Sequence, residues 1–201
     1  MSTKHLVLIL LRVKPMTGYE LAQNTKISVD PLWSATHSQI YGALRKLERD
    51  GLVESTTEVR GERMEKQVYH LTAAGEAAFQ TWLTEPLTTL PNRDPFRLWA
   101  VHIDETPPEI VFRNIDSYIA EQSELAARLE QDAVTFLRGD HPLIEARHGR
   151  IAAERLRQIQ RTRAMIYREL ATKARFEVES ARRMRAYAQE LYPGYIQLEQ
   201  A

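Results

Sequence analysis

In residues 34–53, apolar and polar side chains recur with the period of an α-helix. Ile40, Leu44 and Leu47 recur at intervals of four and three residues, which places them on one helical face. A separate polar line is formed by Ser38, Tyr41, Arg45 and Arg49. Gly51 stands where a left-handed backbone commonly follows a helix, so we expect the helix to end one residue earlier. The pattern predicts a helix that packs with one face and presents the other to solvent.

Two further helices are predicted ahead of this one. Residues 4–13 include six consecutive apolar side chains that Lys14 and Pro15 stop, which indicates a buried core helix. Six residues are too few to cross a membrane, for which about 20 are needed. Thr17 and Glu20 are spaced as a capping box, in which each side chain accepts a hydrogen bond from the other residue's backbone N–H. A second helix is therefore expected from Thr17 to about residue 27.

The period changes from helical to alternating after Leu52. Residues 53–59 alternate in the manner of a strand, residues 60–63 are turn-forming, and residues 67–71 are again β-branched and aromatic. Thr72 is expected to cap a further helix. Three helices followed by a hairpin predict a winged helix-turn-helix, in which the third helix enters the DNA major groove and the hairpin lies against the flanking backbone.

The rest of the chain is predicted to be helical. Prolines recur over residues 86–108, which predicts a linker with one short helix. The next helix is expected to begin at Pro107-Pro108 and to run to Arg138. Residues 150–192 contain neither Gly nor Pro, so one long helix, or two nearly collinear helices, could extend for roughly 60 Å.

The two long predicted helices differ in charge. Residues 109–138 hold six acids and three bases, for −3, whereas residues 150–185 hold eleven bases and four acids, for +7. Both carry apolar residues at spacings near 3.5, the repeat of helices that pair. We expect them to form a hairpin that packs against its copy across a two-fold axis. The residues predicted for this dimerisation are Val111, Ile115, Tyr118, Leu125, Leu129, Leu156, Ile159, Ile166 and Leu170.

These elements predict a mainly α fold with two functional halves. The expected division is a winged helix-turn-helix DNA-binding domain at residues 1–85, a linker and short helix at 86–108, and a helical dimerisation domain at 109–201.

Short motifs along the first half resemble the PadR family of transcriptional regulators. They are Thr17-Gly18-Tyr19-Glu20-Leu21, Ser38-Gln39-Ile40-Tyr41, Leu47-Glu48, Gly51-Leu52-Val53 and Val68-Tyr69-His70-Leu71-Thr72-Ala73-Ala74-Gly75. The resemblance covers residues 4–83, and the second half resembles the virulence-activator branch of the family, which has a long helical C-terminal dimerisation region. It implies a bacterial-type regulator that acts as a homodimer on a pseudo-palindromic operator, with recognition helices in successive major grooves about 34 to 36 Å apart.

The sequence departs from the family pattern at two places. Many members have a strongly basic wing tip, whereas residues 61–66 hold two acids against two bases, which weakens contact with phosphate. Gly42 stands where members often have Pro, and it either loosens the helix by about 1 kcal/mol relative to Ala or lets the backbone approach DNA. A second interpretation stays open, in which the winged helix docks a protein partner without specific DNA binding. The acidic wing tip favours it.

The predicted DNA contacts lie on the third helix, at the start of the second helix and on the wing. Tyr41 lies between Ser38 and Arg45, so we expect it to face phosphate or bases rather than the core. Gln39 and Arg45 are either ordinary surface residues or readers of adenine and guanine edges. His37 is either a cap or a phosphate donor. The full set is Thr17, Tyr19, His37, Ser38, Gln39, Tyr41, Gly42, Arg45, Lys46, Arg63 and Lys66.

Composition narrows the class of protein further. The 201 residues include no Cys, which excludes a disulfide framework and a thiolate metal site and fits a reducing cytoplasm. The net charge of zero divides into +2 over residues 1–72 and −2 over the remainder, so DNA affinity has to come from local charge and from a second copy of the site. The basic excess of the last helix either forms a solvated face or assists DNA binding. With no signal peptide or membrane span expected, we predict a cytoplasmic protein.

Neither catalysis nor a cofactor is expected. The sequence holds no Gly-rich phosphate loop, no Gly-x-Ser-x-Gly elbow and no Cys nucleophile, and its six His show no metal-ligand spacing. The family resemblance implies a response to phenolic or other aromatic compounds. Trp33, Trp82 and Trp99 either line a pocket for such a small aromatic effector or pack in the core.

Overall fold

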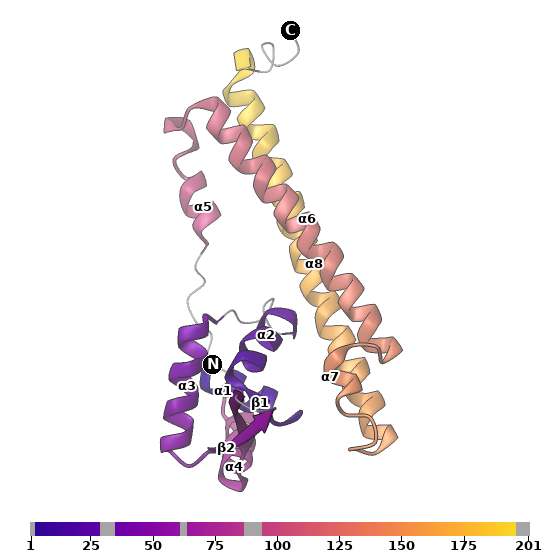
Figure 1. The fold of residues 1–201 in the computed structure, drawn as a ribbon. Helices are drawn as coiled ribbons and strands as arrows, with labels where there is room; N and C mark the ends of the chain where they lie inside the picture. The colour runs from indigo at the N-terminus through magenta and orange to yellow at the C-terminus, as the bar shows by residue number, and fades with distance from the viewer. Residues whose placement is uncertain (1–2, 29–34, 61–63, 87–93, 196–201) are drawn as a thin grey trace. The chain divides into compact units, whose positions relative to one another are not determined.

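The computed structural model describes residues 3–28, 35–60, 64–86 and 94–195 (Figure 1). The chain divides into two compact units, residues 1–88 and 89–201. Most described residues are helical, and a three-stranded antiparallel sheet lies in the first unit, which confirms the predicted fold class. Within the described ranges, no helix is both long and apolar enough to span a membrane.

The first unit is built around the apolar run and the apolar stripe that the sequence predicts. Its elements are α1 (Thr3–Leu11), β1 (Met16–Thr17), α2 (Gly18–Ser28), α3 (His37–Arg49), β2 (Val53–Arg60), β3 (Met64–Leu71) and α4 (Ala73–Thr84). Leu6, Leu8 and Leu10 of α1 are fully buried. Ile40, Leu44 and Leu47 of α3 are each at most 1% exposed. Burial of this stripe fixes which face of α3 remains open to solvent.

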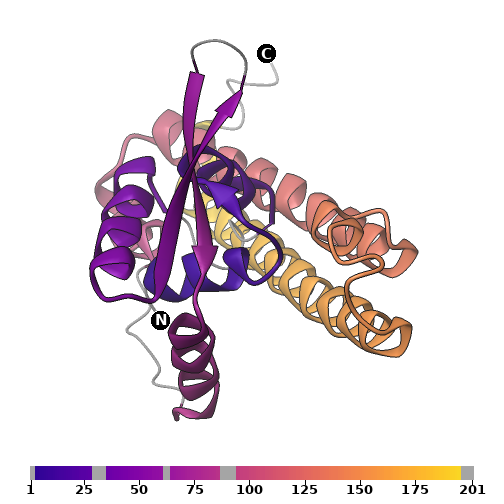
Figure 2. The same cartoon turned by 60° about the horizontal axis from the view of Figure 1, so that its bottom comes forward.

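The sheet has the strand order β1-β3-β2. Strands β2 and β3 form the predicted hairpin, with Val53 opposite Leu71 and Arg60 opposite Met64, and Figure 2 shows the two running side by side. The sequence predicted a two-stranded wing, but β1 adds a third strand, with Met16 opposite Tyr69. A two-residue strand directly before a helix shows no alternation, so period analysis could not detect it.

The predicted ends of the first-unit helices are largely confirmed. Thr17 N–H donates to Glu20 Oε2 at 2.7 Å, and Glu20 N–H donates to Thr17 Oγ1 at 3.2 Å, which closes the capping box of α2. Gly51 has a φ of 70° and follows α3 as expected. The N-cap of α3 is Thr36, so His37 is the first helical residue and not a cap.

The second unit is a pair of long helices with shorter elements packed on it. It contains α5 (Pro95–Ala100), the 3₁₀ helix η1 (Ile103–Glu105), α6 (Pro108–Arg138), α7 (Pro142–Glu145) and α8 (Ala153–Leu191). The 39 residues of α8 form one continuous helix of about 58 Å. Phe96 and Trp99 of α5 pack against the helical pair, and this short helix falls within the second unit.

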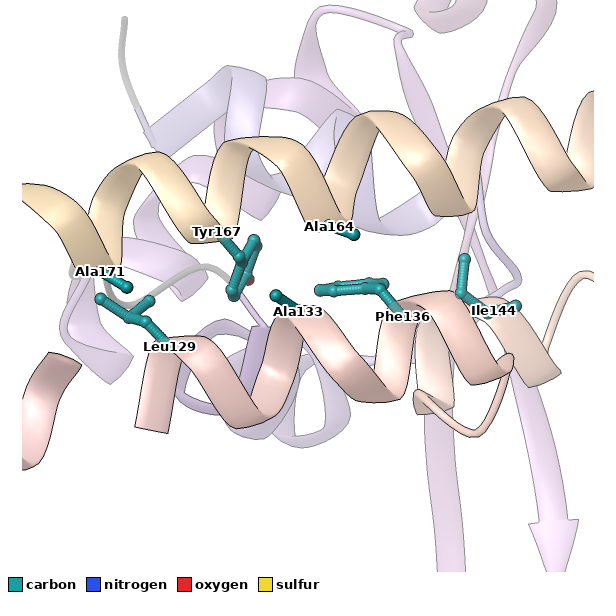
Figure 3. Close-up of a cluster of buried hydrophobic side chains, with 7 residues drawn as sticks. All are labelled: Leu129, Ala133, Phe136, Ile144, Ala164, Tyr167 and Ala171. Atoms are coloured by element: carbon teal, nitrogen blue, oxygen red, sulfur yellow. The ribbon is translucent and has the colours of Figure 1, made fainter. Parts of the chain in front are cut away.

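Helices α6 and α8 lie side by side and bury a shared core (Figures 1 and 3). Phe136 of α6 and Tyr167 of α8 point into the space between them, with ring centroids 4.9 Å apart. The buried line on α8 is mostly alanine and repeats at intervals of three, four or seven residues: Ala164, Tyr167, Ala171, Ala174, Val178, Ala181 and Ala188. Small side chains at this repeat allow two helix backbones to approach closely.

This packing changes the interpretation of the residues predicted for dimerisation. Val111, Ile115 and Leu129 are buried in clusters that α6 and α8 form within one chain. Tyr118, Leu125, Leu156, Ile159 and Leu170 are partly buried against the same clusters. Ile166 does not continue the stripe, because it lies one residue before Tyr167 and is 38% exposed. Most of the stripe therefore packs within the monomer, at least in part.

The opposite charges of the two long helices are used in ion pairs between them. Arg185 of α8 lies 2.7 Å from Asp116 of α6, and Arg175 lies 3.4 Å from Glu130. These side chains are about a third or more exposed, so each pair contributes at most about 1 kcal/mol. The ion pairs thus add little to the pairing of α6 and α8, which also bury a shared apolar core.

Candidate nucleic-acid interface

The open face of α3 carries the polar row that the sequence predicted. Ser38, Arg45 and Lys46 are exposed, and the Tyr41 side chain keeps 39% of its surface accessible. Because Ile40 and its apolar neighbours hold the other face in the core, these side chains project from a helix whose rotation is fixed. A row of hydroxyl, phenol and guanidinium groups can donate hydrogen bonds to phosphates and base edges.

Two predicted contacts are engaged in helix caps. Gln39 Oε1 accepts the backbone N–H of Thr36 at 2.9 Å. Bidentate contact with adenine needs both the oxygen and the amide nitrogen of Gln, so Gln39 would have to leave its cap to read a base in that way. Thr17 donates both its N–H and its hydroxyl to Glu20 Oε2, which leaves no donor for phosphate. The pKa of Glu20 is lowered, first by this backbone hydrogen bond.

A hollow of about 350 Å³ lies at the junction of β1, α2, α3 and β3. Three tyrosine rings contribute to its wall, and two of them, Tyr19 and Tyr41, are exposed. Tyr19 Oη accepts a hydrogen bond from Gln23 at 3.0 Å, so its own hydroxyl proton remains available to donate. The lining residues are Thr17, Gly18, Tyr19, Tyr41, Lys66, Gln67 and Tyr69. The arrangement brings four predicted contact residues, from four elements, to one place.

A polar chain links α3 to the wing. The Ser55 hydroxyl donates to Glu48 Oε1, Gln67 Nε2 donates to Ser55 Oγ at 2.8 Å, and Tyr69 Oη donates to Gln67 Oε1 at 3.2 Å. Burial, followed by the nearby Glu48 carboxylate, raises the pKa of Tyr69, so its phenol stays protonated. The sequence prediction missed all four residues. Period-two alternation shows which strand residues share a face but not which of them bond to a helix.

The remaining predicted contacts have varied surroundings. His37 is exposed at the start of α3, and Lys66 is half-buried on β3. Gly42 has open space around it, because a β-carbon there would meet nothing within 4 Å. Arg63 lies outside the described residues, which omit residues 61–63 of the wing tip.

The tryptophans predicted for an effector pocket have packing partners of their own. Trp82 stacks on His5 in the first unit, with ring centroids 4.7 Å apart, and Trp99 lies 5.9 Å from Phe96 in the second unit. Trp33 lies outside the described residues. In the part of the chain that the structure covers, no group of three or more potential metal ligands occurs.

Residues 7–81 match the family model described as the transcriptional regulator PadR-like family. A probable transcriptional regulator of Mycobacterium tuberculosis is 38% identical over 94 residues, which cover 46% of this chain and 50% of that protein. The negative transcriptional regulator PadR of Bacillus subtilis is 38% identical over 80 residues, which cover 40% of this chain and 44% of that protein. The chain thus spans about half the length, or less, of these curated relatives.

Solved structures resemble a larger part of the chain. Bacillus subtilis PadR in complex with operator DNA has a TM-score of 0.67 at 22% identity, covering 92% of this chain and 98% of that chain. The same protein in complex with p-coumaric acid has a TM-score of 0.62 at 20% identity, covering 92% of this chain and 98% of that chain. The virulence activator AphA of Vibrio cholerae has a TM-score of 0.55 at 21% identity, covering 91% of this chain and 99% of that chain. At these identities the likeness concerns the fold, and it extends over both units.

Family model, relatives and fold agree with the motifs in the sequence, and the relatives they name are regulators of transcription rather than enzymes. Over residues 7–81, this chain is similar to the PadR-like family of transcriptional regulators.

Proposed function

We propose that this protein regulates transcription by binding double-stranded operator DNA as a homodimer. The observation that carries the proposal is the open face of α3, where Ser38, Tyr41 and Arg45 are exposed while the opposite face is locked in the core. Such a helix beside an antiparallel wing fits the major groove. The family match and the operator complex of Bacillus subtilis PadR support this choice.

In this proposal residues 1–85 bind DNA and residues 109–201 hold two copies of the chain together. Residues 86–108 connect these two parts of each chain. Exposed apolar side chains on α8 supply a surface for the second copy. Met165, Phe176 and Tyr187 are 54%, 59% and 56% exposed. They follow one another at eleven-residue intervals, and residues eleven apart differ by only about 20° in direction on an α-helix. They therefore line one face that the single chain leaves uncovered.

Replacing Phe176 by Glu places a charge in the middle of this face. We expect a monomer on a sizing column and much weaker operator binding, with the helical circular-dichroism signal retained. Replacing the exposed Arg113 of α6 by Ala is the matched control and should leave the dimer intact. A Phe176→Glu protein that elutes as the wild-type dimer would exclude this face as the dimer surface.

An aromatic effector forms a further part of the proposal. It is supported by the complex of Bacillus subtilis PadR with p-coumaric acid, which is a property of that protein. Titration of this protein with p-coumaric acid while following Trp fluorescence tests the idea. No change in fluorescence and no release of bound operator up to millimolar ligand would exclude this compound as an effector.

Selection of bound fragments from genomic DNA separates regulation from the alternative of a protein-docking module. A regulator enriches fragments that share a pseudo-palindrome with half-sites about one helical turn, or 34 to 36 Å, apart. A docking module enriches none. Binding of the selected fragments should weaken markedly as salt is raised, because contacts with phosphate release counterions.

A further inference from the structure

Tyr41 of α3 lies directly over the backbone of Gly18, the first residue of α2. A β-carbon at position 18 would lie 2.5 Å from Cε1 and 2.8 Å from Cζ of the Tyr41 ring, and 3.0 Å from its hydroxyl oxygen. Real β-carbons essentially never approach other atoms so closely. The absence of a side chain at residue 18 is therefore what allows the ring to lie where it does.

Backbone geometry gives no other reason for a glycine at this position. Positive φ values occur among the described glycines only at Gly51, Gly139 and Gly149, so Gly18 has a backbone conformation that other residues adopt. Ala is also the better helix former. The sequence therefore has a glycine where helix formation would favour another residue. The contact with Tyr41 explains this glycine, because it leaves no room for a β-carbon at residue 18.

The contact concerns the outer end of an exposed ring rather than the core. An alanine at residue 18 would push Tyr41 outward, because the ring end can rotate whereas the backbone of α2 is held by the Thr17–Glu20 capping box. Gly42, the next residue on α3, behaves differently, since a β-carbon there would meet nothing within 4 Å. The two glycines thus provide a matched pair, one under the ring and one in open space.

We propose that Gly18 is a positioning residue for operator binding, which acts by holding the Tyr41 ring against α2. In this place the ring forms part of the hollow lined by Lys66 and Tyr69 and lies against the start of α2. A DNA contact made by Tyr41 then loses less rotamer freedom on binding, which favours affinity. The inference rests on the proposed function.

The first test needs no DNA. In full-length wild type, nuclear Overhauser effects should connect the Gly18 α-protons with the Tyr41 ring protons. Gly42→Ala should retain them, and in Gly18→Ala the Tyr41 ring should lose its contact with the α-proton of residue 18. A ring that keeps this contact in Gly18→Ala would overturn the inference.

The second test is a double-mutant cycle on operator affinity. Gly18→Ala should weaken binding about tenfold, and in a Tyr41→Ala background it should cause no further loss, because it acts through the ring. An equal loss in both backgrounds would overturn the inference. If wild type binds operator and Gly18→Ala binds equally well, this inference alone fails; if wild type enriches no operator at all, the proposed function fails with it.

Melting temperatures test the same contact between Gly18 and Tyr41 if the Gly18→Ala protein folds poorly. With the Tyr41 ring removed, an alanine at residue 18 meets no obstacle from it and favours the helix. The Gly18→Ala/Tyr41→Ala protein should therefore melt at the same temperature as Tyr41→Ala or higher. A lower melting temperature would show that something other than Tyr41 requires glycine there, and would overturn the inference.

Discussion

Acidification should destabilise the second unit through one buried histidine. His141 is 3% exposed and stacks on Phe136 with ring centroids 3.8 Å apart. Its Nδ1 accepts the backbone N–H of Leu143 at 3.2 Å and so caps α7. Burial, and then the nearby Arg163 guanidinium, lower the pKa of His141 to about 4. Protonation would place a charge in the core and remove the acceptor of the cap.

The sign and size of the effect follow from the two pKa values. The folded-state pKa of about 4 lies below the ordinary value of 6.5, so the unfolded chain binds the proton more readily. Stability from this group is constant above the unfolded pKa and decreases as the pH falls from about 6.5 toward 4. Between pH 7 and pH 5 the expected decrease in unfolding free energy is about 2 kcal/mol.

Urea unfolding at pH 7 and pH 5, at one fixed protomer concentration, measures this decrease. His141→Asn keeps a side chain that caps helices but does not titrate, so its decrease should be smaller by about 2 kcal/mol. His5, whose pKa is lowered, and Asp132, whose pKa is raised, are present in both proteins, and their contributions cancel. Equal decreases in the two proteins, or an NMR titration of His141 near pH 6.5, would refute the reasoning.

Two further predictions concern the core and the start of α3. Phe136→Ala removes a fully buried ring between α6 and α8 and should lower the unfolding free energy by about 3 to 5 kcal/mol in urea, whereas a loss below about 1 kcal/mol would mean that the ring is not core. Thr36→Ala removes the N-cap of α3 and should cost about 1 kcal/mol, while Thr36→Ser should recover most of the melting temperature; equal melting of all three proteins would contradict the cap.

The sequence predicted the first unit well because its signals are local. The Thr17–Glu20 box, the apolar stripe of α3 and Gly51 each depend on neighbours within four residues, and all three appear in the structure. The cap at Thr36 was missed although Gln39 follows it at capping-box spacing. Several polar residues near that helix start could serve as a cap, and the pattern alone did not rank them.

The second unit was predicted less well, because large apolar residues were given more weight than small ones. On α8 the buried line runs through Ala164, Ala171 and Ala181, whereas the predicted stripe included the exposed Ile166. Close packing of two long helices selects for small side chains, and their repeat was present in the sequence. Tyr41 and Gly18 are 23 positions apart on two different helices, and the period within one helix gives no information on their contact.

The most direct test of operator binding by α3 compares Tyr41→Ala/Arg45→Ala with wild type on a selected operator at low salt. The double variant should lose at least about thirtyfold in affinity, because two side chains that contact DNA contribute about 1 to 3 kcal/mol each. It should still elute as the wild type does from a sizing column, and Arg113→Ala should bind as wild type. Unchanged operator binding by the double variant would contradict the assignment of α3 as the reading helix.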